Sequence, residues 1–233
     1  MKNLPPAGEQ LMTREGLASG ALVQALRLNP PPGVCLRSDE ELEQTMEQAL
    51  RGHPPGEDLH VFGYGSLMWN PALQLVDSQL ALVQGWHRRF CIRTLMARGS
   101  LERPGAMLAL DRGGACVGLL MRIAAADVRH ELKLLWRREM LAGSYEARWV
   151  EAQLRGHRLR ALSFVARAGH DRYIGGLSMQ EVATLIRTGQ GQLGCTRSYF
   201  ELTVQTLARL RIRDRGIERL RRAVLEADLA EPK

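Results

Sequence analysis

Two glycines bracket a tyrosine in the segment Val61–Trp69, and a serine follows directly. Glycines permit unusual backbone angles and let a ligand approach the main-chain amides around Gly63 and Gly65 closely. Successive amides in such a turn form a concavity suited to a carboxylate or phosphate. The segment has neither the third glycine of a dinucleotide fingerprint nor the Gly-Lys-Ser/Thr of a P-loop. It predicts an anion-binding loop or, alternatively, a tight turn at a barrel corner.

A second candidate is a glutamate, Glu139, in a segment with helical periodicity. The residues that precede it at helical spacing form one apolar face. They are Val128, Leu132, Leu135 and Trp136. Glu139 therefore projects from the side of the helix that faces the core or a cleft.

A carboxylate in that position is costly unless it is paired, and partial burial raises its pKa. Glu139 is thus a candidate proton acceptor near neutral pH. The alternative is that it lies at the edge of the apolar face and forms a structural ion pair with Arg137 or Arg138. The residues alone leave both interpretations open.

The elements that would position these residues are mostly short apolar runs whose lengths suit β-strands. We expect strands at 60–62, 80–83, 90–93, 107–110, 117–123, 149–154 and 159–165. Asp111–Gly114 has the composition of a hairpin turn between two of them. Many short strands with one inserted helix predict an α+β fold, a small mixed α/β barrel or strongly curled sheet with peripheral helices.

Helical segments accompany the strands. Periodicity predicts helices at about 127–142, 198–212 and 216–227. Ser178 with Glu181 forms a capping box that marks the start of another helix.

The first 58 residues differ from the rest. Residues 1–36 are rich in Pro, Gly and Leu, which predicts an extended arm with one short helix. Ser38 and Glu41 form a capping box for a second helix. We expect 1–58 to be an N-terminal extension with short helices and no chemistry of its own, and 59–228 to be the catalytic domain.

Composition narrows the class of protein. The 233 residues carry a net charge of +7, 45% hydrophobic residues and no run of the roughly 20 apolar residues that span a membrane. The N-terminus lacks the apolar region of a secretory signal, so we expect a cytoplasmic protein. The arginines are spread along the chain, which makes nucleic-acid binding a weak alternative. Cys35, Cys91, Cys116 and Cys195 show no CxxC pair, which predicts buried free thiols.

The loop and the helix together resemble the ChaC family of γ-glutamylcyclotransferases. The resemblance starts from Gly63–Leu67 and Trp136–Met140 and covers about 59–225. It continues through Leu82–Phe90, Arg98–Gly99, Arg103–Gly105, Leu108–Gly114, Gly143–Tyr145 and Gly175–Ser178, with a weaker echo at Leu11–Glu15.

The resemblance implies an enzyme that converts glutathione to 5-oxoproline and Cys-Gly, built on a small mixed α/β barrel. It makes Glu139 the catalytic acid/base and implies no metal and no cofactor. The substrate-binding residues it implies are Gly63, Tyr64, Gly65, Ser66, Leu67, Met68 and Tyr199, where Tyr199 is alternatively a half-buried helix tyrosine. Arg98 is a further candidate, for a carboxylate of glutathione, or alternatively a surface arginine. A small-molecule substrate, no nucleic acid, no membrane and a monomer are the expected partners and state.

One departure from the family concerns the residues just before Tyr199. The family often has Asn there, where this chain has Thr196 and Arg197, so substrate preference or rate can differ. Two alternatives stay open: a cyclotransferase for another γ-glutamyl amine or peptide, and a non-catalytic basic module that binds a partner through its arginines.

Overall fold

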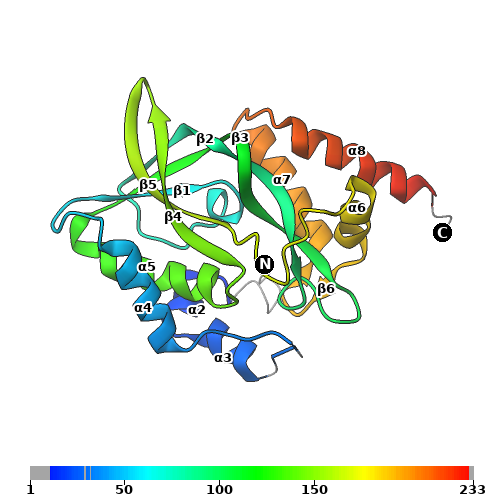
Figure 1. Cartoon of the computed structure of the whole chain (residues 1–233), viewed down its shortest axis with the longest axis horizontal. Coiled ribbons are helices and arrows are strands. Elements are labelled where there is room, and N and C mark those ends of the chain that lie inside the picture. Colours follow the sequence, from blue (N-terminus) through cyan, green and yellow to red (C-terminus); the bar gives the residue numbers. More distant parts are fainter. Residues whose placement is uncertain (1–10, 29, 32, 231–233) are drawn as a thin grey trace, which may run out of the picture.

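Five strands close into a barrel in the computed structural model, which describes residues 11–28, 30–31 and 33–230 (Figure 1). The strands are β1 (Leu59–Gly63), β2 (Asp77–Thr94), β3 (Gly105–Ile123), β4 (Tyr145–Leu154) and β5 (His157–Ala166). They pair in the order β1-β3-β2-β4-β5, and β1 and β5 complete the ring at Val61 and Leu162. The predicted mixed α/β barrel with peripheral helices is confirmed.

The two long strands differ from the prediction. The runs expected at 80–83 and 90–93 are both parts of β2, and those at 107–110 and 117–123 are both parts of β3. The predicted hairpin turn at Asp111–Gly114 is therefore wrong. Its glycines lie opposite a register shift between Gln84 and Trp86, with φ of +94° at Gly113 and +68° at Gly114. Such a bulge bends a strand pair, which lets β2 and β3 curve around the barrel without interruption.

Helices cover two sides of the barrel (Figure 1). On one side lie α6 (Met179–Thr188), α7 (Thr196–Arg209) and α8 (Arg215–Ala230), beside the short hairpin of β6 (Gln190–Gly191) and β7 (Gly194–Cys195). The capping box of Ser178 and Glu181 begins α6, as predicted. Apolar side chains of these helices share one buried cluster with the barrel, which fixes their positions.

The other side carries the helix that ends at the candidate acid/base. After a 3-10 turn, η2 (Ala125–Asp127), the chain forms α5 (Val128–Leu135) and then a π-helical turn, η3 (Trp136–Met140). The predicted helix is thus present, but its last part is wider than an α-helix. Single π turns of this kind are frequent at functional sites.

Within the described residues, three further helices precede the barrel. They are α2 (Arg14–Ala18), α3 (Ala21–Leu28) and α4 (Asp39–Leu50). Where one short helix was predicted before residue 36, residues 11–28 form two, and residues 1–10 lie outside the described residues. The capping box of Ser38 and Glu41 begins α4, as predicted. Apolar residues of the three helices join a second buried cluster with β1, β5 and α5. The predicted domain boundary at residue 58 stays a prediction.

The four cysteines are free. Cys91 and Cys116 are buried in β2 and β3, as predicted, and burial raises the pKa of their thiols to about 12 and about 11. Cys35 is exposed and Cys195 half-buried, so the prediction of buried thiols is wrong for Cys35. Within the described residues, none of the helices combines the length and apolar character needed to span a bilayer.

An ion pair anchors the N-terminal helices to α5. The Arg14 guanidinium binds both carboxylate oxygens of Glu131, whose side chain is 1% exposed. Burial alone would raise the pKa of Glu131, but hydrogen bonds from Arg14 and from the Gln74 amide outweigh it and lower that pKa. The charged carboxylate is thus the form that the folded protein stabilises.

We predict that Arg14→Ala lowers the free energy of unfolding by about 2 to 3 kcal/mol at neutral pH, because Glu131 is left buried without its cation. A depressed carboxyl pKa stabilises the fold above the unfolded-state value of about 4.3, and this contribution disappears as pH falls through the folded-state pKa. The loss measured by urea unfolding should therefore shrink in acid. Arg129→Ala, which breaks the exposed pair with Glu47, is the control and should cost under about 1 kcal/mol. Equal losses in the two variants would contradict this role of Arg14.

Candidate active site

The predicted glycine loop leaves the barrel at the end of β1 and leads into a 3-10 turn, η1 (Ser66–Met68). A side chain at Gly65 would bring its Cβ within 3.2 Å of the Tyr199 hydroxyl, so glycine is needed for this close approach. The first hydrogen bonds of the turn are donated by Met68 and Trp69. The amides that open a helical turn have no partner inside it, so those of residues 65–67 are left for an outside acceptor.

Arg88 in β2 holds this loop from inside the protein. Its side chain is 0% exposed, and its Nε donates to the Tyr64 carbonyl at 2.6 Å. Its two terminal nitrogens reach the Val117 carbonyl and the Asp214 carboxylate, each at 2.6 Å. The loop, β3 and the segment before α8 therefore share one buried guanidinium.

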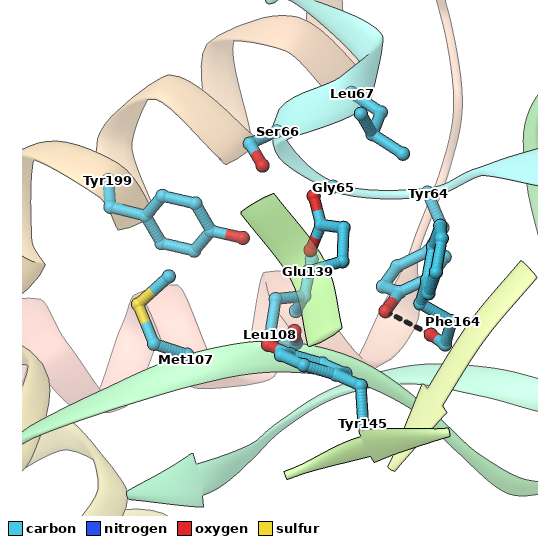
Figure 2. A pocket seen from close by; sticks show the side chains of 10 residues that line it. All are labelled: Tyr64, Gly65, Ser66, Leu67, Met107, Leu108, Glu139, Tyr145, Phe164 and Tyr199. Atoms are coloured by element: carbon cyan, nitrogen blue, oxygen red, sulfur yellow. Dashed lines mark hydrogen bonds between the residues drawn. The ribbon is translucent and has the colours of Figure 1, made fainter. Parts of the chain in front are cut away.

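Tyr64 provides a second anchor for the loop. Its hydroxyl donates to the Phe164 carbonyl in β5 at 2.5 Å (Figure 2). Burial raises the pKa of Tyr64 well above its usual value, so the phenol stays protonated and remains a donor. The ring of Tyr64 lines the cavity, whereas its hydroxyl is occupied by the hydrogen bond to Phe164.

Glu139 lies in the π turn η3 and reaches the same cavity, with its side chain 17% exposed. Figure 2 shows its carboxylate and the hydroxyl groups of Ser66 and Tyr199 directed toward a common space. Burial raises the pKa of the Glu139 carboxyl, and the neighbouring Arg138 opposes part of this rise. A carboxyl with a raised pKa next to bound substrate is suited to proton transfer.

Arg138 connects the acid/base candidate to the loop. Its Nε lies 2.9 Å from Oε1 of Glu139, yet this N–H is not aligned for a hydrogen bond and has no other acceptor among the described residues. The terminal nitrogens donate to Ser66 Oγ at 2.8 Å and to the Asn70 carbonyl at 2.6 Å. Glu139 thus faces the cavity and also pairs with Arg138, while its part in proton transfer stays a prediction.

The cavity has an inner and an outer part. The inner part is lined by six of the predicted site residues together with four others. The six are Tyr64, Gly65, Ser66, Leu67, Glu139 and Tyr199, and the four are Met107, Leu108, Tyr145 and Phe164. The outer part has a volume of about 500 Å³, and the two parts share Ser66, Met107, Glu139, Tyr145 and Tyr199. Glu139 therefore stands where the two parts meet.

Three of the predicted site residues lie elsewhere. Arg98 lines only the outer part, where its Nη1 donates to Ser198 Oγ at 3.1 Å. Gly63 and Met68 line neither part. Gly63 ends β1, where an added Cβ would meet Met121 Cε at 2.6 Å, and Met68 is a buried core residue. Both residues thus pack around the loop, and their part in substrate binding stays a prediction.

The two residues that depart from the family pattern have different positions. Thr196 is 0% exposed and donates from Oγ1 to the Arg98 carbonyl at 2.8 Å, so it fixes the backbone beside the outer cavity. Arg197 lies on the surface of α7 and pairs with Glu201 and Asp228. Of the two residues, Thr196 is the one that contacts a residue lining the cavity.

The family model described as "ChaC-like protein" matches residues 59–227. The chain belongs to this family. Among curated relatives, the ChaC-like chain is 37% identical over 186 residues to the glutathione-specific γ-glutamylcyclotransferase of Escherichia coli K12, covering 79% of this chain and 80% of that one. It is 33% identical over 146 residues to the mouse glutathione-specific γ-glutamylcyclotransferase 1, covering 60% and 66%.

Solved structures agree on the fold of the ChaC-like domain. The yeast γ-glutamyl cyclotransferase specific to glutathione superposes with a TM-score of 0.68 at 20% sequence identity, over 73% of this chain and 96% of the yeast chain. At that identity the likeness concerns the fold alone. The barrel with its surrounding helices is thus shared with a protein of this kind.

Several residues of the site in this ChaC-like chain were not among the predicted ones. Tyr145 lines the inner part of the cavity, whereas Arg138 and Arg172 line the outer part. Arg88 lines neither part and acts through its hydrogen bond to the carbonyl of Tyr64. Arginine is usually exposed, so composition gave no reason to place these side chains inside. The one available signal was that Arg88 lies in an alternating strand pattern next to Arg89, where one of two neighbours must face inward.

We predict that Arg88→Lys loses about 3 kcal/mol of folding free energy and most of its activity, because one ammonium cannot serve three separated acceptors and Asp214 is left poorly paired. Arg89→Lys is the matched control. Arg89 is 39% exposed and pairs with Asp111, so its loss should be about 1 kcal/mol or less. Urea unfolding and a turnover assay on both variants measure this. An Arg88→Lys protein as stable as the control would contradict the clamp.

Proposed function

We propose that this protein is a γ-glutamylcyclotransferase that converts glutathione to 5-oxoproline and Cys-Gly, with Glu139 as its acid/base. The observation that carries the proposal is the desolvated Glu139 carboxylate, which faces the glycine loop across one cavity. The names of the relatives in E. coli and mouse support the reaction and the substrate.

The chemistry begins at the α-amine of the γ-glutamyl group. This amine is protonated near neutral pH and cannot attack until it loses a proton. Glu139 accepts that proton, because its raised pKa makes it a stronger base than an ordinary carboxylate. The amine nitrogen then bonds to the γ-carbonyl carbon, and the γ-amide C–N bond breaks. Glu139 returns its proton to the leaving amine, and in total two of the three ammonium protons leave on Cys-Gly.

The loop and Arg138 supply charge complementarity. The substrate brings an α-carboxylate and develops negative charge on the γ-carbonyl oxygen. The amides of residues 65–67, Ser66 Oγ and the unaligned Nε of Arg138 are the donors on this side of the cavity. Holding the chain folded, with amine against carbonyl, supplies the proximity that an intramolecular attack needs.

The remaining expectations complete the proposal. We expect a cytoplasmic monomer that acts without metal or cofactor and binds neither nucleic acid nor membrane. The free cysteines are consistent with a reducing compartment. Within the described residues, no group of three or more His, Cys, Asp or Glu side chains is arranged to hold a metal ion.

We predict that the wild type releases 5-oxoproline from glutathione and that Glu139→Gln reduces this at least about 100-fold, the usual scale for loss of a general acid/base. Gln keeps the size of the side chain and removes its basicity. Product is quantified with glutathione and with γ-Glu-Ala, in the presence of a chelator that should leave the rate unchanged. Glu201→Gln, on the exposed face of α7, is the control.

Each result of that experiment points to one conclusion. Release mainly from γ-Glu-Ala would keep the mechanism and change the substrate to another γ-glutamyl compound. No product from either substrate would contradict the proposed function and favour a binding module. Full activity in Glu139→Gln would remove Glu139 from the mechanism.

The pH dependence tests the same carboxylate independently. We predict that kcat/KM falls in acid through a midpoint above the pKa of an ordinary glutamate, because the buried base must be ionised to act. In Arg138→Met the midpoint should move further up, since the cation that opposes the effect of burial is gone. An acid limb at the ordinary glutamate value, or one unmoved by Arg138→Met, would contradict this account.

A further inference from the structure

The outer cavity extends away from Glu139 toward the N-terminal helices. Its residues come from the loop, the ends of β2 and β3, the π turn, and the segment that includes α2 and α3. A volume of about 500 Å³ falls within the range of small-molecule sites. Since ring closure takes place at Glu139, whatever is attached to the γ-carbonyl extends either inward or into this space. The inner part is far smaller, at about 40 Å³.

One wall of the outer cavity is apolar and comes from the N-terminal extension. Met12, Leu22 and Leu26 line it, and they share one apolar cluster with Met96 and Leu193, which also line the cavity. The extension is tied to the site by Asn70, whose amide nitrogen donates to the Met12 carbonyl at 3.1 Å. The expectation that residues 1–58 only pack on the barrel is therefore incomplete, because their side chains shape the cavity.

The outer cavity is also strongly positive. Four arginines and one glutamate line it: Arg93, Arg98, Arg138, Arg172 and Glu139. Arg138 is paired with Glu139, and Arg98 donates to Ser198 and to the Cys195 carbonyl. The lining thus carries more cations than its single carboxylate can balance, which favours an anionic ligand.

Among these four arginines, Arg172 combines deep burial with few hydrogen-bond acceptors. It is 7% exposed. Its guanidinium donates to the Ala142 carbonyl, and its other contact is Met96 Sδ at 4.0 Å. No carboxylate of the described chain forms an ion pair with it. Burial lowers the pKa of Arg172, because the charged guanidinium loses water without gaining a carboxylate partner. A buried arginine without an anion is costly, so a carboxylate supplied by a ligand would be bound strongly.

We propose that the outer cavity is the subsite for the leaving dipeptide of the substrate, with Arg172 binding its terminal carboxylate and the apolar wall of the N-terminal extension contacting its first side chain. The inference rests on the proposed function and deepens it. It makes Arg172 a specificity-determining residue, since γ-glutamyl compounds whose leaving group has no terminal carboxylate would leave this cation unpaired.

The first test changes the substrate and leaves the protein intact. Wild-type kcat/KM is measured for glutathione and for its glycinamide analogue, γ-Glu-Cys-Gly-NH2, which lacks only the terminal negative charge. Loss of one charge-assisted hydrogen-bonded contact predicts a roughly 10- to 100-fold preference for glutathione. Equal kcat/KM for the two compounds would overturn the inference while leaving the cyclotransferase function intact. Failure to release 5-oxoproline from either would overturn both.

The second test asks which cation is responsible. Arg172→Met should abolish the preference by slowing glutathione to the rate of the amide, and Arg172→Lys should restore part of it. The matched control is Arg93→Met, which removes the same charge from an exposed residue of the same cavity and should keep the preference. Retention of the preference in Arg172→Met, or its loss in Arg93→Met or Arg98→Met alone, would overturn the assignment. Thermal melts identify a variant that fails to fold. If Arg172→Met does not fold, the preference for glutathione over the amide is compared between Arg172→Lys and wild type, and an unchanged preference would overturn the assignment.

Discussion

Burial of the Arg88 guanidinium forces three distant parts of the chain to meet at one point. A cation without water must be surrounded by acceptors, and here they are the carbonyls of Tyr64 and Val117 and the carboxylate of Asp214. The first belongs to the loop, the second to β3 and the third to the segment before α8. Because moving the loop would leave a buried charge unsatisfied, the interaction that joins α8 to the barrel also fixes where the loop amides point.

A second arginine, Arg138, also holds the loop, but it lies beside the carboxylate that the proposed mechanism uses as a base. Arg138 holds the loop through Ser66, and the proposed mechanism requires that it also leave Glu139 basic enough to accept a proton. The two demands conflict, because a well-made ion pair lowers a carboxyl pKa. Burial of Glu139 outweighs the opposing effect of Arg138, so the pKa of the carboxyl is raised. The π turn that carries both residues sets this geometry.

Local patterns in the sequence were enough to predict the barrel, both capping boxes, the loop and the cavity-facing glutamate. The errors came where one pattern has two structural meanings. Asp111–Gly114 reads as a hairpin turn, yet the same glycines form a bulge inside β3 when a partner strand continues alongside. The π turn has no signature in residue type. Arg88 and Arg172 were missed because inward-facing arginines are identified only by acceptors that lie far away in sequence.

The cavity is assembled from two parts of the chain, the barrel with its helices and the N-terminal extension. The family model begins at residue 59, whereas Met12, Leu22 and Leu26 form part of the wall. The segment that carries these side chains is tied to the rest of the protein by the Asn70 amide, which donates to the Met12 carbonyl, and by the Arg14–Glu131 pair. The proposed dipeptide subsite and the proposed acid/base are thus carried by different parts of the chain. In evolutionary terms, that arrangement would let substrate range diverge through the wall while catalytic power is preserved at Glu139.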